Sequence, residues 1–383
     1  MDKRRSGSIA TVLVAIFVLL VVVTVGGVVH DWPHDHLLPG LSGGHAKTYR
    51  ADVLATRVTR CPTPVTQGCS VAVVRLTSGP DSGRRTNLSF IGSSHSEHVS
   101  AGDAILLAKD GPSYSFVDFD RSGALLWLAA IFALVVVVVG RWHGLRALFG
   151  LTASLATVVF FVVPAIADGK PAVQVAAFGG LGVMLLTMPV VHGGGAKSLA
   201  ACLGTAAALF LTLGLSDLFT SLVHLSGLAS DEAFTAQLFT SVSTRGLLLA
   251  GMTIGALGVL GDTTVTQAST VIALRRANPS LGFTELVRHA TSVGRDHIAA
   301  TINTLVLAYT GASLPLLIIL STENVSLGSA INGQAIAEPV VATLVGSIGL
   351  VAAVPFTTAL ASLLALHLPE RRLAGEHVHA HAH

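Results

Sequence analysis

Charged side chains are scarce in this sequence. Asp, Glu, Lys and Arg make up 11% of the 383 residues, whereas soluble domains carry about 25%. The shortage excludes an ordinary soluble protein, and the 51% hydrophobic content indicates an integral membrane protein in a lipid bilayer. The chain also lacks basic patches interleaved with aromatic residues, so nucleic acid is not an expected partner.

Long apolar runs are abundant in contrast. A helix needs roughly 20 mainly apolar residues to cross about 30 Å of hydrocarbon. We therefore expect an α-helical polytopic membrane protein with about eight transmembrane helices. The predicted spans are Ile9–Val29, Gly123–Val139, Leu148–Ile166, Val173–Val191, Leu199–Leu215, Gly246–Val265, Ala299–Leu320 and Val340–Leu366. Residues 1–29 would form an N-terminal anchor helix and residues 123–368 a seven-helix bundle.

Lysine and arginine follow a bias that orients the chain, because short cytoplasmic loops are enriched in both. With the N-terminus inside, Lys170 and Arg245 fall outside. The inner set is Lys3, Arg4, Arg5, Arg141, Arg146, Lys197, Arg275, Arg276, Arg288, Arg295, Arg371 and Arg372. Both termini are thus predicted to be cytoplasmic. The alternative for the first span is a cleaved signal peptide, but its apolar run exceeds the usual 7–15 residues or so and no small-x-small site follows.

Residues 30–122 read as an extracytoplasmic β-rich domain. Five short runs, YRADVLATRV, SVAVVRLT, NLSFI, DAILLAK and SYSFVDF, have strand character and are separated by turn signals. They predict a small antiparallel barrel, for which an OB-like topology is one arrangement. Cys61 and Cys69 are expected to form a disulfide on this oxidising side, the alternatives being free thiols or a metal pair. Cys202, within the fifth span, would be inert packing.

The inner segment at about 266–298 is interrupted by ANPSLGF. After it, Phe283, Leu286, Val287, Ala290 and Val293 recur at helical spacing. They predict an amphipathic helix at the inner membrane surface or an ordinary solvated loop helix.

One carboxylate interrupts the sixth span. Asp262 is the only ionisable residue between Leu247 and Leu274. It shares a helix face with four glycines that would let helices pack closely in lipid, so we expect it to face other helices. These glycines are Gly251, Gly255, Gly258 and Gly261. One hypothesis is an ion or proton site that also includes Thr263, Thr266 and Gln267. The alternative is that the helix ends near Gly261 and Asp262 caps the next one.

A second polar cluster opens the seventh span. Asp296, Asn303 and Thr310 recur every seven residues and share a face, with His297 beside the first of them. Together the sixth and seventh spans predict a polar transport site. No nucleophile–base pair, metal triad or nucleotide fingerprint is visible, so neither an enzyme nor a cofactor is expected.

Histidines cluster at two other places. His30, His34 and His36 lie with Asp31 and Asp35 after the first span, where metal capture and a solvated polar junction are both possible readings. The cytoplasmic tail, residues 369–383, ends in HVHAHAH. Its weak candidate metal ligands are His377, His379, His381 and His383.

Two long stretches resemble a known family. GALGVLGDTTVTQAS (255–269) and GRDHIAATINTLVLAYTGASLPLL (294–317) are similar to the signature stretches of the YibE/F-like family of bacterial membrane proteins. The resemblance covers nearly the whole chain. It implies a polytopic fold and a bacterial cell membrane location, and it implies no catalytic residues. The residues favour a secondary transporter or permease for an ion or small solute. The alternative is a non-transporting envelope protein whose outer β domain binds a partner or cell-wall ligand.

Overall fold

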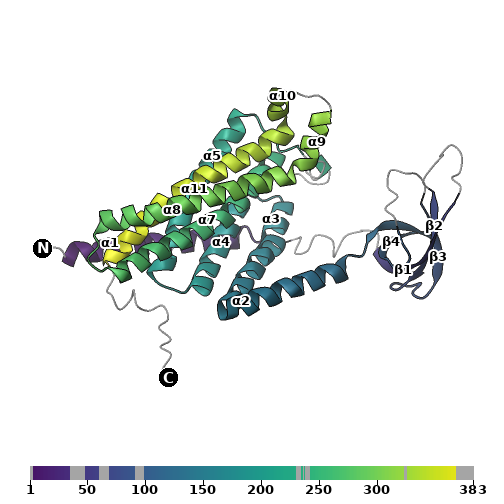
Figure 1. Ribbon diagram of the computed structural model, residues 1–383, viewed down its shortest axis with the longest axis horizontal. Helices are drawn as coiled ribbons and strands as arrows, with labels where there is room; N and C mark the ends of the chain where they lie inside the picture. Colours follow the sequence, from purple (N-terminus) through teal and green to yellow (C-terminus); the bar gives the residue numbers. More distant parts are fainter. Residues whose placement is uncertain are drawn as a thin grey trace, which may run out of the picture. The chain divides into compact units, whose positions relative to one another are not determined.

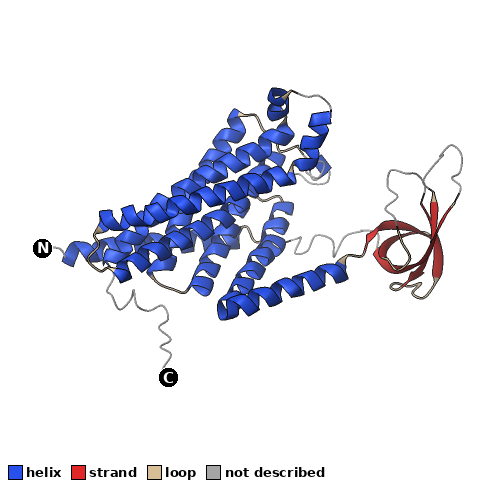
Figure 2. Cartoon of the chain, viewed as in Figure 1, coloured by secondary structure: helices blue, strands red, loops and turns tan. Residues whose placement is uncertain are grey.

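The structure, a computed structural model, is mostly helical with one β-sheet (Figure 2). It describes residues 3–34, 48–59, 69–90, 99–229, 234–235, 237, 242–322 and 326–367. The chain divides into two compact units. Residues 1–38 and 146–383 form the helical unit, and residues 39–145 form the β unit. The predicted boundary at 122/123 differs from the unit boundary at 145/146, because residues 123–145 group with the sheet.

The β unit holds a five-stranded antiparallel half-barrel sheet in the order β3-β2-β1-β4-β5. Its strands are β1 (Thr48–Val58), β2 (Ser70–Leu76), β3 (Arg85–Phe90), β4 (Ala104–Asp110) and β5 (Ser113–Phe119). All five predicted strands are confirmed. Alternate residues, such as Val53, Val74, Ile105 and Leu107, form the core on one face, as the period of two requires. A bulge between Val53 and Ala55 bends β1. The OB-like topology stays a prediction.

A small polar network ties the sheet together. Asp81, in the turn before β3, accepts hydrogen bonds from the Lys109 ammonium (2.6 Å) and the Tyr114 hydroxyl (2.5 Å). These hydrogen bonds, that from Lys109 first, hold the pKa of the Asp81 carboxyl below its ordinary value of 3.8. Cys69 is buried just before β2. Cys61 lies outside the described residues, so the disulfide stays a prediction.

The helices are labelled in Figure 1. They are α1 (Lys3–His30), α2 (Ser122–Thr157), the π-helix η1 (Val158–Val162), α3 (Val163–Ala167), α4 (Ala172–His192), α5 (Ala196–Leu222), α7 (Thr244–Ala277), α8 (Phe283–Ala312), α9 (Leu314–Thr322), α10 (Leu327–Asn332) and α11 (Gln334–His367). Among the described residues six helical stretches are long and apolar enough to cross a membrane, or seven if α8 and α9, bent by 58°, form one broken span. The protein is therefore a multi-pass membrane protein.

The count is lower than the eight predicted spans because two of them are merged. Residues 123–139 and 148–166 fall in one 46-residue helical stretch, Ser122–Ala167. Arg141 interrupts it with φ 48° and ψ −127°, which is not helical. The basic residue thus stands at a sharp kink where the sequence predicted a loop.

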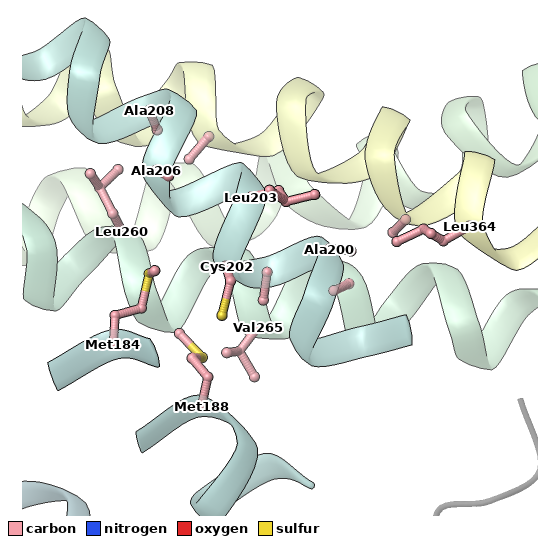
Figure 3. Packing of buried hydrophobic residues seen from close by; sticks show 14 of the residues in the cluster. Met184, Met188, Ala200, Cys202, Leu203, Ala206, Ala208, Leu260, Val265 and Leu364 are labelled. Carbon is pink, nitrogen blue, oxygen red and sulfur yellow. The ribbon is translucent and has the colours of Figure 1, made fainter. Parts of the chain in front are cut away.

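The core of the helical unit lies where α4, α5, α7 and α11 meet (Figure 3). Met184 and Met188 of α4, Cys202 of α5, Val265 of α7 and Leu364 of α11 are all buried there. Cys202 is a free thiol surrounded by apolar side chains, consistent with a packing role.

Helices α5 and α11 pack closely against each other in this core. A Cβ atom added to Gly204 would lie 2.9 Å from the Cβ atom of Thr357, and one added to Gly349 would lie 3.3 Å from that of Thr212. Two glycines on opposite helices therefore each accommodate a threonine. We call this contact, defined by Gly204, Thr212, Gly349 and Thr357, the α5–α11 seam. Small residues allow such approach in lipid.

The inner segment differs from its prediction. No separate surface helix forms, because α7 continues to Ala277 and α8 runs without a break from Phe283 to Ala312. The predicted interruption at ANPSLGF is the turn between them. Arg275 Nη1 donates to the Leu281 carbonyl at 2.9 Å, and Glu285 accepts from the Gly282 N–H at 3.0 Å. These contacts make α7 and α8 an antiparallel hairpin.

Candidate functional site

Asp262 lies in the middle of the continuous helix α7, so it does not cap a second helix. Its side chain is 72% exposed, and its Oδ2 atom lies 3.6 Å from Nε2 of His297 on α8. The carboxylate therefore meets one neighbouring helix, α8, but it is mostly exposed and is not buried within the bundle as expected. The packed face of α7 is instead the one that carries Leu260, Thr264 and Ala268.

The glycines beside Asp262 explain this outcome. A Cβ atom at Gly251 or Gly258 would meet nothing within 4 Å. At Gly255 it would meet the Tyr309 hydroxyl, and at Gly261 the Met188 methyl, each at 3.5 Å. The expected close packing along this glycine face is therefore absent among the described residues, although Tyr309 comes from α8.

Gln267 connects three helices in the interior. Its side chain is 2% exposed. Its Nε2 atom donates to the Ala290 carbonyl of α8 at 2.8 Å and to the Thr358 hydroxyl of α11 at 2.7 Å. Gly294 makes room for it, since a Cβ atom there would lie 2.8 Å from the Gln267 Oε1 atom. The amide fixes the hairpin against α11.

Several buried hydroxyl groups lie on α5, α7 and α11, in addition to this amide. The Thr205 and Thr264 hydroxyls, from α5 and α7, lie 2.7 Å apart. Among the residues that the structure describes, the hydroxyls of Thr263, Thr357 and Ser362 are buried and have no hydrogen-bond partner. Buried polar groups are normally satisfied by protein or water. This polar layer, Gln267 with the buried hydroxyls of α5, α7 and α11, therefore has hydrogen-bonding capacity to spare.

The remaining predicted residues lie elsewhere. Asp296, Asn303 and Thr310 are all exposed on α8, and Thr266 of α7 is half-buried. Thr310 lines a mostly apolar groove of about 280 Å³ between α8 and α11, together with Tyr309 and Thr343. The structure thus brings Asp262 together with His297, and Gln267 together with α8 and α11, but it does not gather all seven predicted residues into one site.

His297 is a functional candidate that the predicted site did not include. The sequence pattern placed it only beside Asp296 at the start of the seventh span. A signal was present, because Asp262 and His297 stand about equally far from the turn at 278–282. Two helices joined by a short turn pack side by side, so residues at matching distances from it come close. The four tail histidines lie outside the described residues, so metal binding there stays a prediction.

Comparison with known proteins gives one match. The family described as YibE/F-like protein matches residues 128–367. No curated protein matches the chain, and no solved structure does. The match takes in both helices of the hairpin, the polar layer and the α5–α11 seam, and it extends over more than half of the sequence. The chain belongs to the YibE/F-like family.

Proposed function

We propose that this protein is a secondary transporter or permease for an ion or small solute, without an enzymatic step, and that a proton or cation is exchanged at the Asp262–His297 pair. One observation carries the proposal. Two titratable side chains from different membrane helices meet at 3.6 Å, on the same hairpin as the buried polar layer. Carboxylates and imidazoles within membrane helices mark proton and ion pathways.

The exposure of Asp262 bears on its role. An ionised side chain facing lipid at the bilayer centre costs about 2.5–3.5 kcal/mol even on insertion scales. Asp262 reduces that cost if His297 is protonated or if a cation is bound, and either event changes the charge of the pair. Thr263, the next residue, turns the other way and is 1% exposed with an unpartnered hydroxyl.

The packing of the helices supports eight spans with both termini in the cytoplasm. Near one end of α4, the Lys170 ammonium contacts the carbonyl of His30, the last residue of α1, at 3.4 Å. At the other end of α4, Gly150 lies against Val191. The chain therefore leaves the helical unit at one end of α4 and returns at the opposite end. An extra crossing by residues 122–140 accounts for this, with Arg141 and Arg146 then inside with Lys197.

The test is flux into proteoliposomes under imposed pH and cation gradients. We expect Asp262→Asn and His297→Gln each to reduce flux at least about tenfold, since each removes one partner of the exchanging pair. Asp296→Asn is the matched control, because Asp296 is also an exposed carboxylate on the hairpin, one residue before His297. Its flux should stay within about twofold of wild type.

The contradicting outcomes are equally definite. Flux that is unchanged in folded Asp262→Asn and His297→Gln proteins would remove the pair from the mechanism. Absence of wild-type flux for protons and for every cation and anion tested would remove the transport function itself.

A further inference from the structure

The exposed face of the β-sheet carries two arginines directly opposite each other. Strands β2 and β3 lie side by side at one edge of the sheet (Figure 1), and in their register Arg75 stands opposite Arg85. Both residues are exposed, whereas Val74 and Leu76, on either side of Arg75, are buried in the core on the other face. The Cβ atoms of directly opposite residues lie about 4.5–5.5 Å apart, and like charges in this position destabilise a sheet. Folding alone therefore does not account for this pair.

Acidic side chains neutralise the two arginines only in part. The Arg75 Nη2 atom lies 3.6 Å from Oδ2 of Asp52, which stands opposite Arg75 on β1. The Arg85 side chain has no recorded hydrogen bond or ion pair in the described part of the chain. Other carboxylates of the unit are engaged elsewhere, namely Asp81 with Lys109, Asp118 with Arg121 and Asp120 with Arg50. A net positive charge remains on the row Asp52–Arg75–Arg85.

A third arginine extends the positive charge along the same face. Arg57 is exposed and stands opposite Val71 of β2, which stands opposite Ser89 of β3. The Arg57 side chain also has no recorded partner within the described residues. Val71 lies four residues before Arg75, so the two positive positions are roughly 14 Å apart along the strand. We call the exposed residues Arg57, Arg75, Arg85, Asn87 and Ser89 the basic face.

The basic face extends away from the start of the membrane helix. Helix α2 begins beside Arg50, whose Nη2 atom donates to the Ser122 hydroxyl at 3.3 Å and whose Nε atom lies 2.9 Å from the Asp120 carboxylate. Arg57 lies seven residues further along β1, which is roughly 20 Å after allowance for the bulge. Lipid headgroups at the start of α2 are therefore close to the paired Arg50 and remote from the unpaired Arg57.

We propose that the basic face binds a linear polymer that carries phosphate groups, outside the cytoplasm, where the predicted orientation places the β unit. Guanidinium groups bind phosphate through two parallel hydrogen bonds. A phosphate between Arg75 and Arg85 removes their mutual repulsion, and a second phosphate of the same polymer meets Arg57. Because the positive positions are separated, a polymer suits this surface better than a single ion does.

The experiment measures binding of long-chain polyphosphate to the full chain in a non-ionic detergent. Orthophosphate at the same concentration of phosphate groups is the single-ion control. We expect saturable binding of polyphosphate, at least about tenfold tighter per phosphate group than that of orthophosphate. Affinity should fall about tenfold or more between about 50 and 200 mM salt, because binding to a polyanion releases its condensed counterions.

Variants then identify the residues responsible. Arg85→Gln should weaken polyphosphate binding about fivefold, and replacement of Arg57, Arg75 and Arg85 together by Gln should weaken it at least about twentyfold. Arg84→Gln is the matched control, since it removes the same charge one residue earlier. The Arg84 carbonyl accepts from the N–H of Leu76, a core residue, so its side chain belongs to the opposite face. Its affinity should stay within about twofold of wild type.

Thermal unfolding separates a binding role from a structural one. Arg85→Gln removes the repulsion from Arg75, so the unfolding temperature should be unchanged or raised while polyphosphate binding is weakened. A lowered unfolding temperature with unchanged binding would show that Arg85 is kept for folding.

Three further results would overturn the proposal. The first is a folded triple variant that binds polyphosphate as tightly as wild type does. The second is an equal loss of affinity in Arg84→Gln and Arg85→Gln, a comparison that needs no multiple variant to fold. The third is unsaturable polyphosphate binding together with arginine-dependent binding to phosphatidylglycerol vesicles, which would assign the basic face to a membrane surface. None of these measurements involves flux, so this proposal and the transport proposal can fail separately.

Discussion

Glycine is used in opposite ways in two regions of the helical unit. In the α5–α11 seam, Gly204 and Gly349 each stand opposite a threonine so close that an added methyl group would collide with it. On α7, Gly251 and Gly258 face open space. The regular spacing of the α7 glycines predicted close packing there, yet close packing occurs at Gly204 and Gly349 instead.

The difference shows what a small-residue pattern can and cannot indicate. Spacing places residues on one face of a helix, but contact requires a partner helix with complementary side chains. In the α5–α11 seam each glycine has such a partner, because Thr357 fits against Gly204 and Thr212 fits against Gly349. The α7 stripe has only ordinary contacts in the described structure, with Tyr309 at Gly255 and with Met188 at Gly261. The following predictions test this contrast, beginning with the largest effect.

Gly204→Ala should destabilise the protein by about 1–3 kcal/mol, because the new methyl group forces α5 and α11 apart. Thermal unfolding in detergent is the measurement. Gly214→Ala on the same helix is the control, since a Cβ atom there meets nothing within 4 Å. Adding Thr357→Ala to Gly204→Ala should recover part of the loss. If Gly204→Ala and Gly214→Ala unfold at the same temperature, the seam is not closely packed.

Gln267→Met should cost about 1–2 kcal/mol, because two buried hydrogen bonds are lost while the volume is nearly kept. Faster hydrogen exchange is expected in α8 at Ala290 and in α11 at Thr358. Asn303→Ala, at an exposed position of α8, should change stability by less than about 0.5 kcal/mol. An equally large loss in Asn303→Ala would show that its exposed face packs against something in the membrane.

Acid should weaken the β unit through Asp81. The pKa of this carboxyl is lowered in the folded state, chiefly by the Lys109 hydrogen bond and then by that of Tyr114. Its contribution to stability is therefore complete above about pH 4, the ordinary range, and is lost as the pH falls through the lowered folded-state value. Hydrogen exchange of β4 and β5 should accelerate on acidification in wild type and less so in Asp81→Asn. Identical acid profiles in the two proteins would contradict the role of Asp81.

Gly258→Ala should have the smallest effect and the opposite sign. Alanine favours a helix over glycine by up to about 1 kcal/mol, and the added methyl group meets nothing. We expect a slightly raised unfolding temperature. A clear destabilisation in lipid would mean that a second helix covers the α7 stripe there and that the contrast with the seam fails.

Much of the fold followed from local patterns. All five strands were predicted because alternation and turn residues are local signals. The apolar runs predicted each helix that is long and apolar enough to cross a membrane in the described part of the chain, but not the join of two runs at Arg141. The short stretch between Val139 and Leu148 reads as a loop by composition, and the structure bends the helix sharply there instead.

The site was predicted less completely than the fold. Asp262 and Gln267 were both selected, but the prediction gave them one shared environment. They project from opposite sides of α7, so one is 72% exposed and the other is buried between α8 and α11. For Asp31 the difference has the opposite direction. A charged residue next to a membrane span is expected to be exposed to solvent, whereas the structure buries the Asp31 side chain.

The sequence by itself determined that the chain lies in a lipid bilayer, and it determined where helices and strands form. Each of these depends on composition and on periodicity within about 20 residues. It also carried the stretches that mark the YibE/F-like family. Only the tertiary structure decided which polar groups face one another: Asp262 with His297, Gln267 with Thr358, and Asp31 with His30. Those pairings depend on the rotation of each helix against its neighbours, and packing between residues distant in the chain sets that rotation.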